Sequence, residues 1–120
     1  MTVLDASALL AFVQGEPGAE VVEAEIEDAV IGAANWSEVV QKVLSRGGDL
    51  AILKALLQSY RVQIVPVSQE DAEEAALIWS PSGGLSLGDR LCMALAERLQ
   101  QPILTADRVR GEGSRIRQIR

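Results

Sequence analysis

The chain has 120 residues and a mass of 12.9 kDa, the size of one domain, and 48% of its residues are hydrophobic and 23% are charged. This composition excludes intrinsic disorder and low complexity, and a lone cysteine, Cys92, excludes a disulfide framework. The net charge of −6 argues against broad nonspecific nucleic-acid binding, and the lack of histidine excludes catalytic triads, Cys-His nucleophiles and His-rich zinc sites. Any catalysis must therefore depend on carboxylates, hydroxyls, Arg, Lys and bound metal.

No segment of the chain is suited to a membrane or to export. The longest uninterrupted apolar run covers residues 8–13, which is too short to span a bilayer. Only Met1 and Thr2 precede the first apolar stretch, and Asp5 interrupts it, so no signal peptide is expected. We expect a cytoplasmic protein with no membrane contact.

The first half of the chain alternates short strands and helices. Val3-Leu4 predicts a strand that leads into a helix over 7–13, and Gly15 and Pro17-Gly18 end that helix. A second helix is expected over 19–28 and a strand at Val30-Ile31. The apolar spacing from Asn35 predicts a helix that ends at Gly47-Gly48, and the helical period then continues over residues 50–60.

The second half continues the alternation. Residues 62–67 form the clearest strand, and Ser68 with Asp71 predicts a capping box that opens a helix through Trp79. After a loop at 81–84, residues 86–99 predict the most regular helix, with Leu87, Leu91, Leu95 and Leu99 on one face. Strands follow at 103–105 and, as an edge strand, at 116–119. This order predicts one α/β domain over residues 1–120, with a mostly parallel sheet covered by helices on both faces.

Four carboxylates occupy special places in this order. Asp5 and Asp107 follow strands, Glu38 lies one helical turn beyond another strand, and Asp89 begins the helix over 86–99. Because the carboxyl ends of parallel strands share one edge, where ligands usually bind, all four acids are expected to converge. Such a cluster needs a counter-charge, and a hard divalent cation with oxygen ligands is the natural one.

Each acid also has a simpler interpretation. Asp5 can cap the helix that begins near Ser7, and Asp107 can cap a turn. The pairs Asn35/Glu38 and Ser86/Asp89 have the spacing of capping boxes. Taken one at a time the capping interpretation is favoured, whereas four caps have no reason to share one edge.

Four ordered motifs resemble the PIN domain family, and within it the VapC-type toxins of toxin–antitoxin pairs. The motifs cover nearly the whole chain: Val-Leu-Asp-Ala-Ser-Ala-Leu at 3–9, Asn-Trp-Ser-Glu-Val at 35–39, Gly-Leu-Ser-Leu-Gly-Asp-Arg-Leu-Cys-Met-Ala-Leu-Ala at 84–96, and Pro-Ile-Leu-Thr-Ala-Asp at 102–107. Each motif alone is weak, and their order makes the resemblance specific.

The resemblance implies a three-layer PIN-like fold with a five-stranded sheet. It implies an endoribonuclease that cleaves RNA phosphodiester bonds with Mg²⁺, or Mn²⁺ in its place, and that a cognate antitoxin inhibits. By position, Asp5, Glu38, Asp89 and Asp107 match the catalytic acids, with Asp5, Asp89 and Asp107 as metal ligands. Ser7 and Thr105 match positions that support the pocket by hydrogen bonding. Similar toxins are usually homodimers, and the apolar residues of 50–60 with Trp36 offer surface for one.

The chain departs from the family pattern after Asp107. Members often carry an aromatic residue or another acid there, where this chain has Arg108-Val109-Arg110. Residues 108–120 hold five arginines against one acid, Glu112, a local charge of +4. Arg108 and Arg110 are therefore expected either to hold the RNA backbone near the pocket or to form a solvated face beside an edge strand.

Two other small α/β folds with acids at strand ends fit less well. A phospho-acceptor receiver domain needs paired acids after the first strand and a late lysine, whereas Asp5 stands alone and the lysines, Lys42 and Lys54, lie mid-chain. A haloacid-type phosphotransferase needs Asp-x-Asp, where this chain has Asp5-Ala6-Ser7. The remaining rival is a PIN-like RNA- or protein-binding module without nuclease activity.

Overall fold

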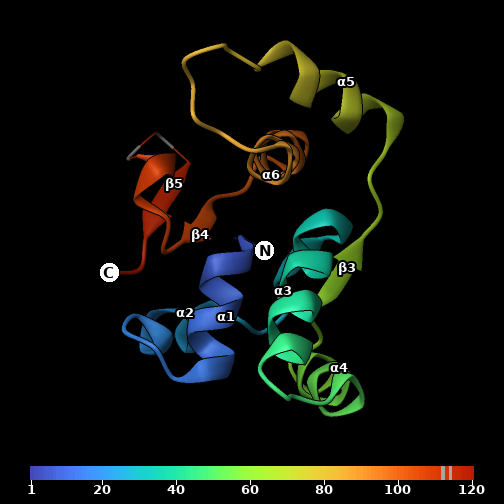
Figure 1. The fold of residues 1–120 in the computed structure, drawn as a ribbon, viewed down its shortest axis with the longest axis vertical. Helices are drawn as coiled ribbons and strands as arrows, with labels where there is room; N and C mark the ends of the chain where they lie inside the picture. Colours follow the sequence, from blue (N-terminus) through green and yellow to red (C-terminus); the bar gives the residue numbers. More distant parts are fainter. Residues whose placement is uncertain (112, 114) are drawn as a thin grey trace.

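A computed structural model describes residues 1–111, 113 and 115–120. Strands and helices alternate along the chain, as Figure 1 shows. In order, the elements are β1 (Val3–Leu4), α1 (Ala6–Gln14), α2 (Ala19–Glu25), β2 (Val30–Gly32), α3 (Ala33–Ser45), α4 (Leu50–Ser59), β3 (Gln63–Val65), α5 (Gln69–Leu77), α6 (Leu87–Leu99), β4 (Ile103–Thr105), the 3₁₀ turn η1 (Arg108–Arg110) and β5 (Ile116–Gln118).

The five strands form one parallel sheet in the order β3-β2-β1-β4-β5. The carboxyl ends of β1, β2 and β4 therefore lie at the same edge of the sheet, with β1 in the centre. The predicted edge strand at the C-terminus is present as β5, paired with β4 from Ile103↔Ile116 to Thr105↔Gln118. The predicted α/β fold with a parallel five-stranded sheet is confirmed.

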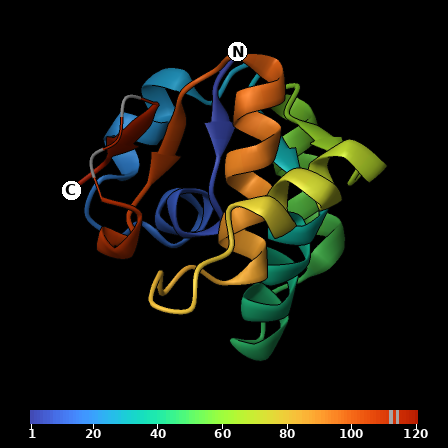
Figure 2. The same ribbon diagram turned by 90° about the horizontal axis from the view of Figure 1, so that it is seen from above.

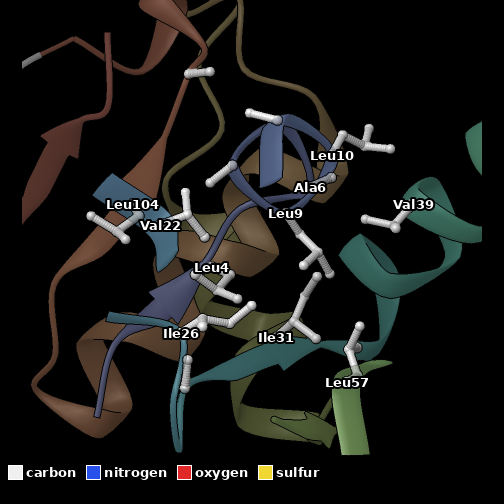
Figure 3. Close-up of a cluster of buried hydrophobic side chains, with 14 of the residues drawn as sticks. Leu4, Ala6, Leu9, Leu10, Val22, Ile26, Ile31, Val39, Leu57 and Leu104 are labelled. Carbon is white, nitrogen blue, oxygen red and sulfur yellow. The ribbon is translucent and has the colours of Figure 1, made fainter. Parts of the chain in front are cut away.

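Helices cover both faces of the sheet, which gives three layers (Figure 2). Leu4, Ile31 and Leu104 point to the face that packs against α1, α2, α3 and α4, where the larger hydrophobic cluster lies (Figure 3). The strand residues that precede them point to the opposite face, beneath Cys92, Leu95 and Ala96 of α6; these are Val3, Val30 and Ile103. This alternation of side chains buries both faces, as expected for strands that are apolar throughout.

Some local expectations were wrong. The strand predicted over 62–67 pairs only at Gln63–Val65, because it lies at the sheet edge and Pro66 has no amide to donate. Ser68 does cap α5 through the Asp71 amide, but the Asp71 carboxylate binds Arg98, so no capping box forms. Leu87 is 59% exposed and does not pack with the other leucines of α6, contrary to the predicted leucine face.

The part of the chain that the structure describes contains no helix long and apolar enough to cross a membrane.

Helices α5 and α6 are joined by a charge pair between the buried Asp71 and the partly exposed Arg98. Asp71 is almost fully buried, and its two carboxylate oxygens accept from Nε and Nη2 of Arg98 at 2.8 and 2.9 Å. The two parallel hydrogen bonds and the burial of Asp71 make this pair stronger than an ion pair exposed at the surface. The hydrogen bonds from Arg98 hold the pKa of Asp71 below its ordinary value.

We expect Asp71→Asn to lower the free energy of unfolding by about 2 kcal/mol at neutral pH, because a charged hydrogen-bonded pair is lost. Since the pKa of Asp71 is lowered in the folded state, its contribution is full above the ordinary Asp pKa and is lost as the pH falls. Urea unfolding at neutral and acidic pH measures this, with the exposed neighbour Glu70→Gln as control. An equal effect of both substitutions would contradict the role of the pair.

Candidate active site

A cavity of about 250 Å³ opens at the edge where β1 and β4 end. The four predicted acids, Asp5, Glu38, Asp89 and Asp107, all line it. They come from four separate parts of the fold: the end of β1, helix α3, the first turn of α6, and the segment after β4. The predicted convergence of the four carboxylates is therefore observed.

Asp5 is the most firmly held of the four. It is buried, follows β1 directly and is the N-cap of α1, where its Oδ1 accepts from the Ala6 amide at 2.9 Å. Its Oδ2 accepts from Ser7 Oγ at 2.9 Å and from Thr105 Oγ1 at 2.7 Å. Ser7 and Thr105, which the family resemblance expects to support the pocket by hydrogen bonding, thus both donate to Asp5.

The two hydroxyl groups are themselves held by the backbone after β4. The Ala106 amide donates to Ser7 Oγ and the Asp107 amide donates to Thr105 Oγ1, both at 2.9 Å. These bonds fix the chain where Asp107 enters the cavity, and Gln118 of β5 adds a bond to the Asp107 carbonyl at 3.0 Å. The position of Asp107 is therefore coupled to the hydroxyls that hold Asp5.

Asp89 serves two purposes at once. Its Oδ2 accepts from the Ser86 amide at 2.9 Å while Ser86 Oγ accepts from the Asp89 amide at 3.1 Å, so the predicted capping box of α6 is present. Its Oδ1 lies 3.2 Å from Arg110 Nη2, and the residue lines the cavity. Capping one helix and lining the pocket are thus compatible for the same carboxylate.

Glu38 reaches the cavity from α3 and is positioned by Asn35. Because α3 begins at Ala33, these two residues lie inside the helix and form no capping box, contrary to one interpretation of their spacing. Asn35 is buried, and its Nδ2 donates to Glu38 Oε1 at 3.0 Å and to the Gly88 carbonyl at 3.2 Å. A Cβ at Gly88 would lie 2.7 Å from Glu38 Oε1, so a side chain at this position would displace the Glu38 carboxylate from its place beside Asn35.

Burial raises the pKa of Glu38, and the neighbouring charges of Asp5 and Asp89 add to this effect against the lowering bond from Asn35. Asn35 is the residue of this site whose positioning role the sequence did not indicate. Its spacing to Glu38 suggested a helix cap, and only the path of α6 shows that Asn35 bridges two helices.

Arg110 fills the space between two of the acids. Its Nη2 lies 2.7 Å from Asp5 Oδ1 and 3.2 Å from Asp89 Oδ1, and its Nη1 donates to the Asp89 carbonyl at 3.0 Å. The Arg110 side chain is 0% exposed, so it faces the acids and not an RNA-binding surface as the sequence suggested. Arg108, on the same turn, is exposed.

The donor chemistry of the pocket suits a hard divalent cation, since every acid offers carboxylate oxygens. With Arg110 in place, however, the oxygens of Asp5 and Asp89 are occupied by its guanidinium, so the pocket in this arrangement does not suit a divalent cation. Among the described residues, no three acidic or cysteine side chains are grouped as metal ligands would be. The sequence predicted a metal as the counter-charge of the acids, whereas here a guanidinium has that position.

Cys92 lies beneath the pocket on α6 and is buried, and burial raises its pKa to about 12. A thiol with this pKa stays protonated at neutral pH, so Cys92 is a packing residue, as the sequence indicated, and not a nucleophile.

The cavity is also lined by basic residues. Lys42, Arg46 and Arg120 line it together with Gln14 and Glu16. Lys42 follows Glu38 by four residues on the same side of α3, and Arg46 is the C-cap of that helix. Arg46 donates to the Gln14 side chain, and Arg120 donates to the Pro17 carbonyl at 3.1 Å. We call Lys42, Arg46 and Arg120 the basic rim.

Comparisons with known proteins identify similar sequences and similar folds. The model of the PIN domain family matches residues 2–109. The chain is 31% identical over 125 residues to "Ribonuclease VapC" of Mycolicibacterium smegmatis, and this alignment covers 95% of this chain and 94% of that protein. It is 29% identical over 114 residues to "Ribonuclease VapC42" of Mycobacterium tuberculosis, covering 85% of this chain and 87% of that protein.

Two solved structures share the fold at low sequence identity. A toxin–antitoxin complex from Klebsiella pneumoniae superimposes with a TM-score of 0.82 at 20% identity, over 100% of this chain and 98% of that one. VapC20 of Mycobacterium tuberculosis, described as a sarcin-ricin loop cleaving toxin, superimposes with a TM-score of 0.68 at 18% identity, over 86% of this chain and 87% of that one.

We expect Glu38→Gln to stabilise the metal-free protein slightly. The pKa of Glu38 is raised in the folded state, so its ionised form opposes folding once the pH exceeds the ordinary Glu value. The gain should be below about 1 kcal/mol, because the side chain is largely exposed, and it should vanish at about pH 3 where Glu38 is protonated. Gln keeps the oxygen that accepts from Asn35. Thermal unfolding at neutral and acidic pH tests this against Glu23→Gln on α2, and a loss of stability at neutral pH would contradict it.

Proposed function

The chain belongs to the PIN domain family, and from this and its acidic pocket we propose that it is an endoribonuclease acting in the cytoplasm as the toxin of a toxin–antitoxin pair. Its reaction is hydrolysis of RNA phosphodiester bonds, and a single domain over residues 1–120 carries it out. Relatives whose names describe them as VapC ribonucleases support the substrate class.

One observation carries this proposal: four carboxylates from four separate segments line a single cavity. Capping explains Asp5 and Asp89, but it does not explain Glu38, which lies inside α3. Clustered like charges cost free energy, so a fold retains them for chemistry more readily than for stability.

We propose that Asp5, Asp89 and Asp107 hold a divalent cation, Mg²⁺ or Mn²⁺. When bound, such a cation lowers the pKa of a water molecule and offsets the negative charge that develops on the phosphate. Ser7 and Thr105 keep the Asp5 carboxylate oriented by donating to its Oδ2.

Glu38 acts on the attacking water in this proposal. It lines the cavity, Asn35 fixes its Oε1, and its raised pKa is shifted in the direction that suits a group accepting a proton near neutral pH. The catalytic residues are then Asp5, Glu38, Asp89 and Asp107.

The RNA backbone reaches these acids along the basic rim. Lys42, Arg46 and Arg120 share the cavity with the acids, so phosphates on either side of the scissile bond find cations within the same site. Arg108 is exposed on η1 and extends the positive surface near Asp107.

We further propose an antitoxin partner and a homodimer. An antitoxin peptide that binds across α3 and α6 covers the pocket between Glu38 and Asp89. The exposed apolar side chains of Leu44 on α3 and Ile52 on α4, with the half-buried Trp36, give these two helices a surface for self-association.

A second function, a PIN-like binding module without nuclease activity, is favoured by one observation. The Arg110 guanidinium binds the carboxylates of both Asp5 and Asp89, so a chain that keeps this arrangement binds no metal ion between these two acids. Cleavage of RNA in the presence of Mg²⁺ or Mn²⁺ distinguishes the two functions.

We expect Asp5→Asn and Asp89→Asn each to reduce Mn²⁺-dependent RNA cleavage by about 100-fold or more, because each removes charge needed in the transition state. Asp49→Asn is the matched control: Asp49 caps α4 through Oδ1 and the Ile52 amide at 3.1 Å but lies outside the acidic cavity. Cleavage of a fluorescent single-stranded RNA measures all three. Equal activity of the three variants, or no cleavage by the native chain with either metal, would exclude the nuclease function.

We expect the double substitution Lys42→Gln, Arg46→Gln to weaken RNA binding and flatten its salt dependence. Two lost phosphate contacts reduce the slope of log affinity against log salt by about 1.4 for single-stranded RNA. Anisotropy titrations with an RNA at several salt concentrations measure the slope. Lys54→Gln, an exposed lysine on α4 outside the cavity, is the control. An unchanged slope in the double variant would place the RNA elsewhere.

A further inference from the structure

The Asp5 carboxylate has no acceptor capacity left while Arg110 is in place. Two carboxylate oxygens offer about four lone-pair sites. Oδ1 accepts from the Ala6 amide at 2.9 Å and from Arg110 Nη2 at 2.7 Å, and Oδ2 accepts from Ser7 and Thr105 at 2.9 and 2.7 Å. A further ligand of Asp5 must therefore displace one of these four donors.

Three of the four donors are fixed by the surrounding fold. The Ala6 amide belongs to the first turn of α1, and Ser7 and Thr105 are held by the amides of Ala106 and Asp107. Arg110 is the exception, because it reaches the pocket from η1, a single 3₁₀ turn.

Arg110 is also less completely satisfied than the other donors. Its side chain is fully buried, yet its Nε has no hydrogen-bond partner. A buried donor without a partner costs free energy, and leaving the pocket relieves that cost. The η1 backbone is held by a 3.2 Å bond from the Arg110 amide to the Asp107 carbonyl and a 3.0 Å bond from the Gly111 amide to the Arg108 carbonyl. The Gln118 side chain also donates to the carbonyls of Asp107 and Gly111 at 3.0 and 2.9 Å.

We propose that Arg110 is a built-in cation of the acidic pocket that competes with the divalent metal ion for Asp5 and Asp89. This inference rests on the proposed metal-dependent function. Metal and guanidinium require the same carboxylate oxygens and carry charge of the same sign, so the pocket holds one or the other. Metal binding is thereby coupled to release of the η1 turn.

The coupling has two consequences for the molecule. Without metal, the single positive charge of Arg110 offsets part of the negative charge of Asp5 and Asp89, which lowers their mutual repulsion and keeps the pocket assembled. With metal, part of the binding free energy is spent on moving Arg110, and the apparent metal affinity is lower than the carboxylates alone would give.

Mn²⁺ affinity in the folded protein tests the proposal without an activity assay. Titration calorimetry is carried out on the native chain, on Arg110→Met and on Arg108→Met. Arg110→Met should bind Mn²⁺ more tightly than the native chain by roughly 5-fold to 150-fold, the usual range of thermodynamic coupling. Arg108→Met removes an exposed charge from the same turn and should change the affinity by less than about twofold, because solvent and salt screen it.

The possible outcomes separate this inference from the proposed function. Tighter binding confined to Arg110→Met supports the competition. Equal Mn²⁺ affinity of the native chain and Arg110→Met overturns the competition and leaves the metal-dependent function standing. Absence of Mn²⁺ binding in all three proteins overturns both.

A second measurement uses the native chain alone, so it holds even where Arg110→Met fails to fold. Amide hydrogen exchange followed by NMR, with and without Mg²⁺, reports on the η1 bonds of Arg110 and Gly111. Release of Arg110 predicts faster exchange at these two amides when Mg²⁺ saturates the site. Unchanged or slower exchange at both amides in the saturated protein would overturn the coupling.

Discussion

The buried Asp5 carboxylate is the interaction on which the rest of the pocket depends. Its position between β1 and α1 means that one side chain caps a helix, bonds to Thr105 of β4 and pairs with Arg110 of η1. Residues about one hundred positions apart are thereby joined in the centre of the parallel sheet, where β1 and β4 are neighbours. A buried charge of this kind is tolerated only because every acceptor site has a donor, so the same bonds that stabilise the fold also orient the acid for ligand binding.

Much of the site was predictable because its residues carry local signals. Asp5 and Asp89 were open to two interpretations, cap or ligand, and the structure shows that both have capping bonds while facing the same cavity. The choice between the two interpretations was therefore not a real one. For Glu38 the capping interpretation failed, because α3 begins two residues earlier than Asn35, at Ala33, and a glycine precedes it. Start positions of helices depend on where the preceding strand ends, which short-range spacing does not record.

The position of Arg110 was not predictable from the sequence for a different reason. Arginines close to an edge strand are typical of solvated surface, and the high local positive charge after Asp107 supported a surface role. Only the parallel register of β4 and β5, with η1 between them, turns this side chain inward to the acids. The expectation that the acids need a divalent counter-ion was sound electrostatics, but it considered only the motifs themselves. The counter-charge came from the one segment where the chain departs from the family pattern.

The net charge of −6 and an RNA substrate are compatible because the relevant field is local. Glu38 and Lys42 lie one helical turn apart on α3, so the charge changes sign across the cavity within a single helix. The basic rim attracts phosphate, whereas the acids repel it unless a cation lies among them. In the proposed function, Arg110 partly neutralises the acids but also occupies them, so RNA can approach while metal-dependent cleavage is blocked. Exchange of Arg110 for a divalent ion then lowers the repulsion of phosphate further and supplies the catalytic cation, so catalytic competence depends on which of the two cations the pocket holds.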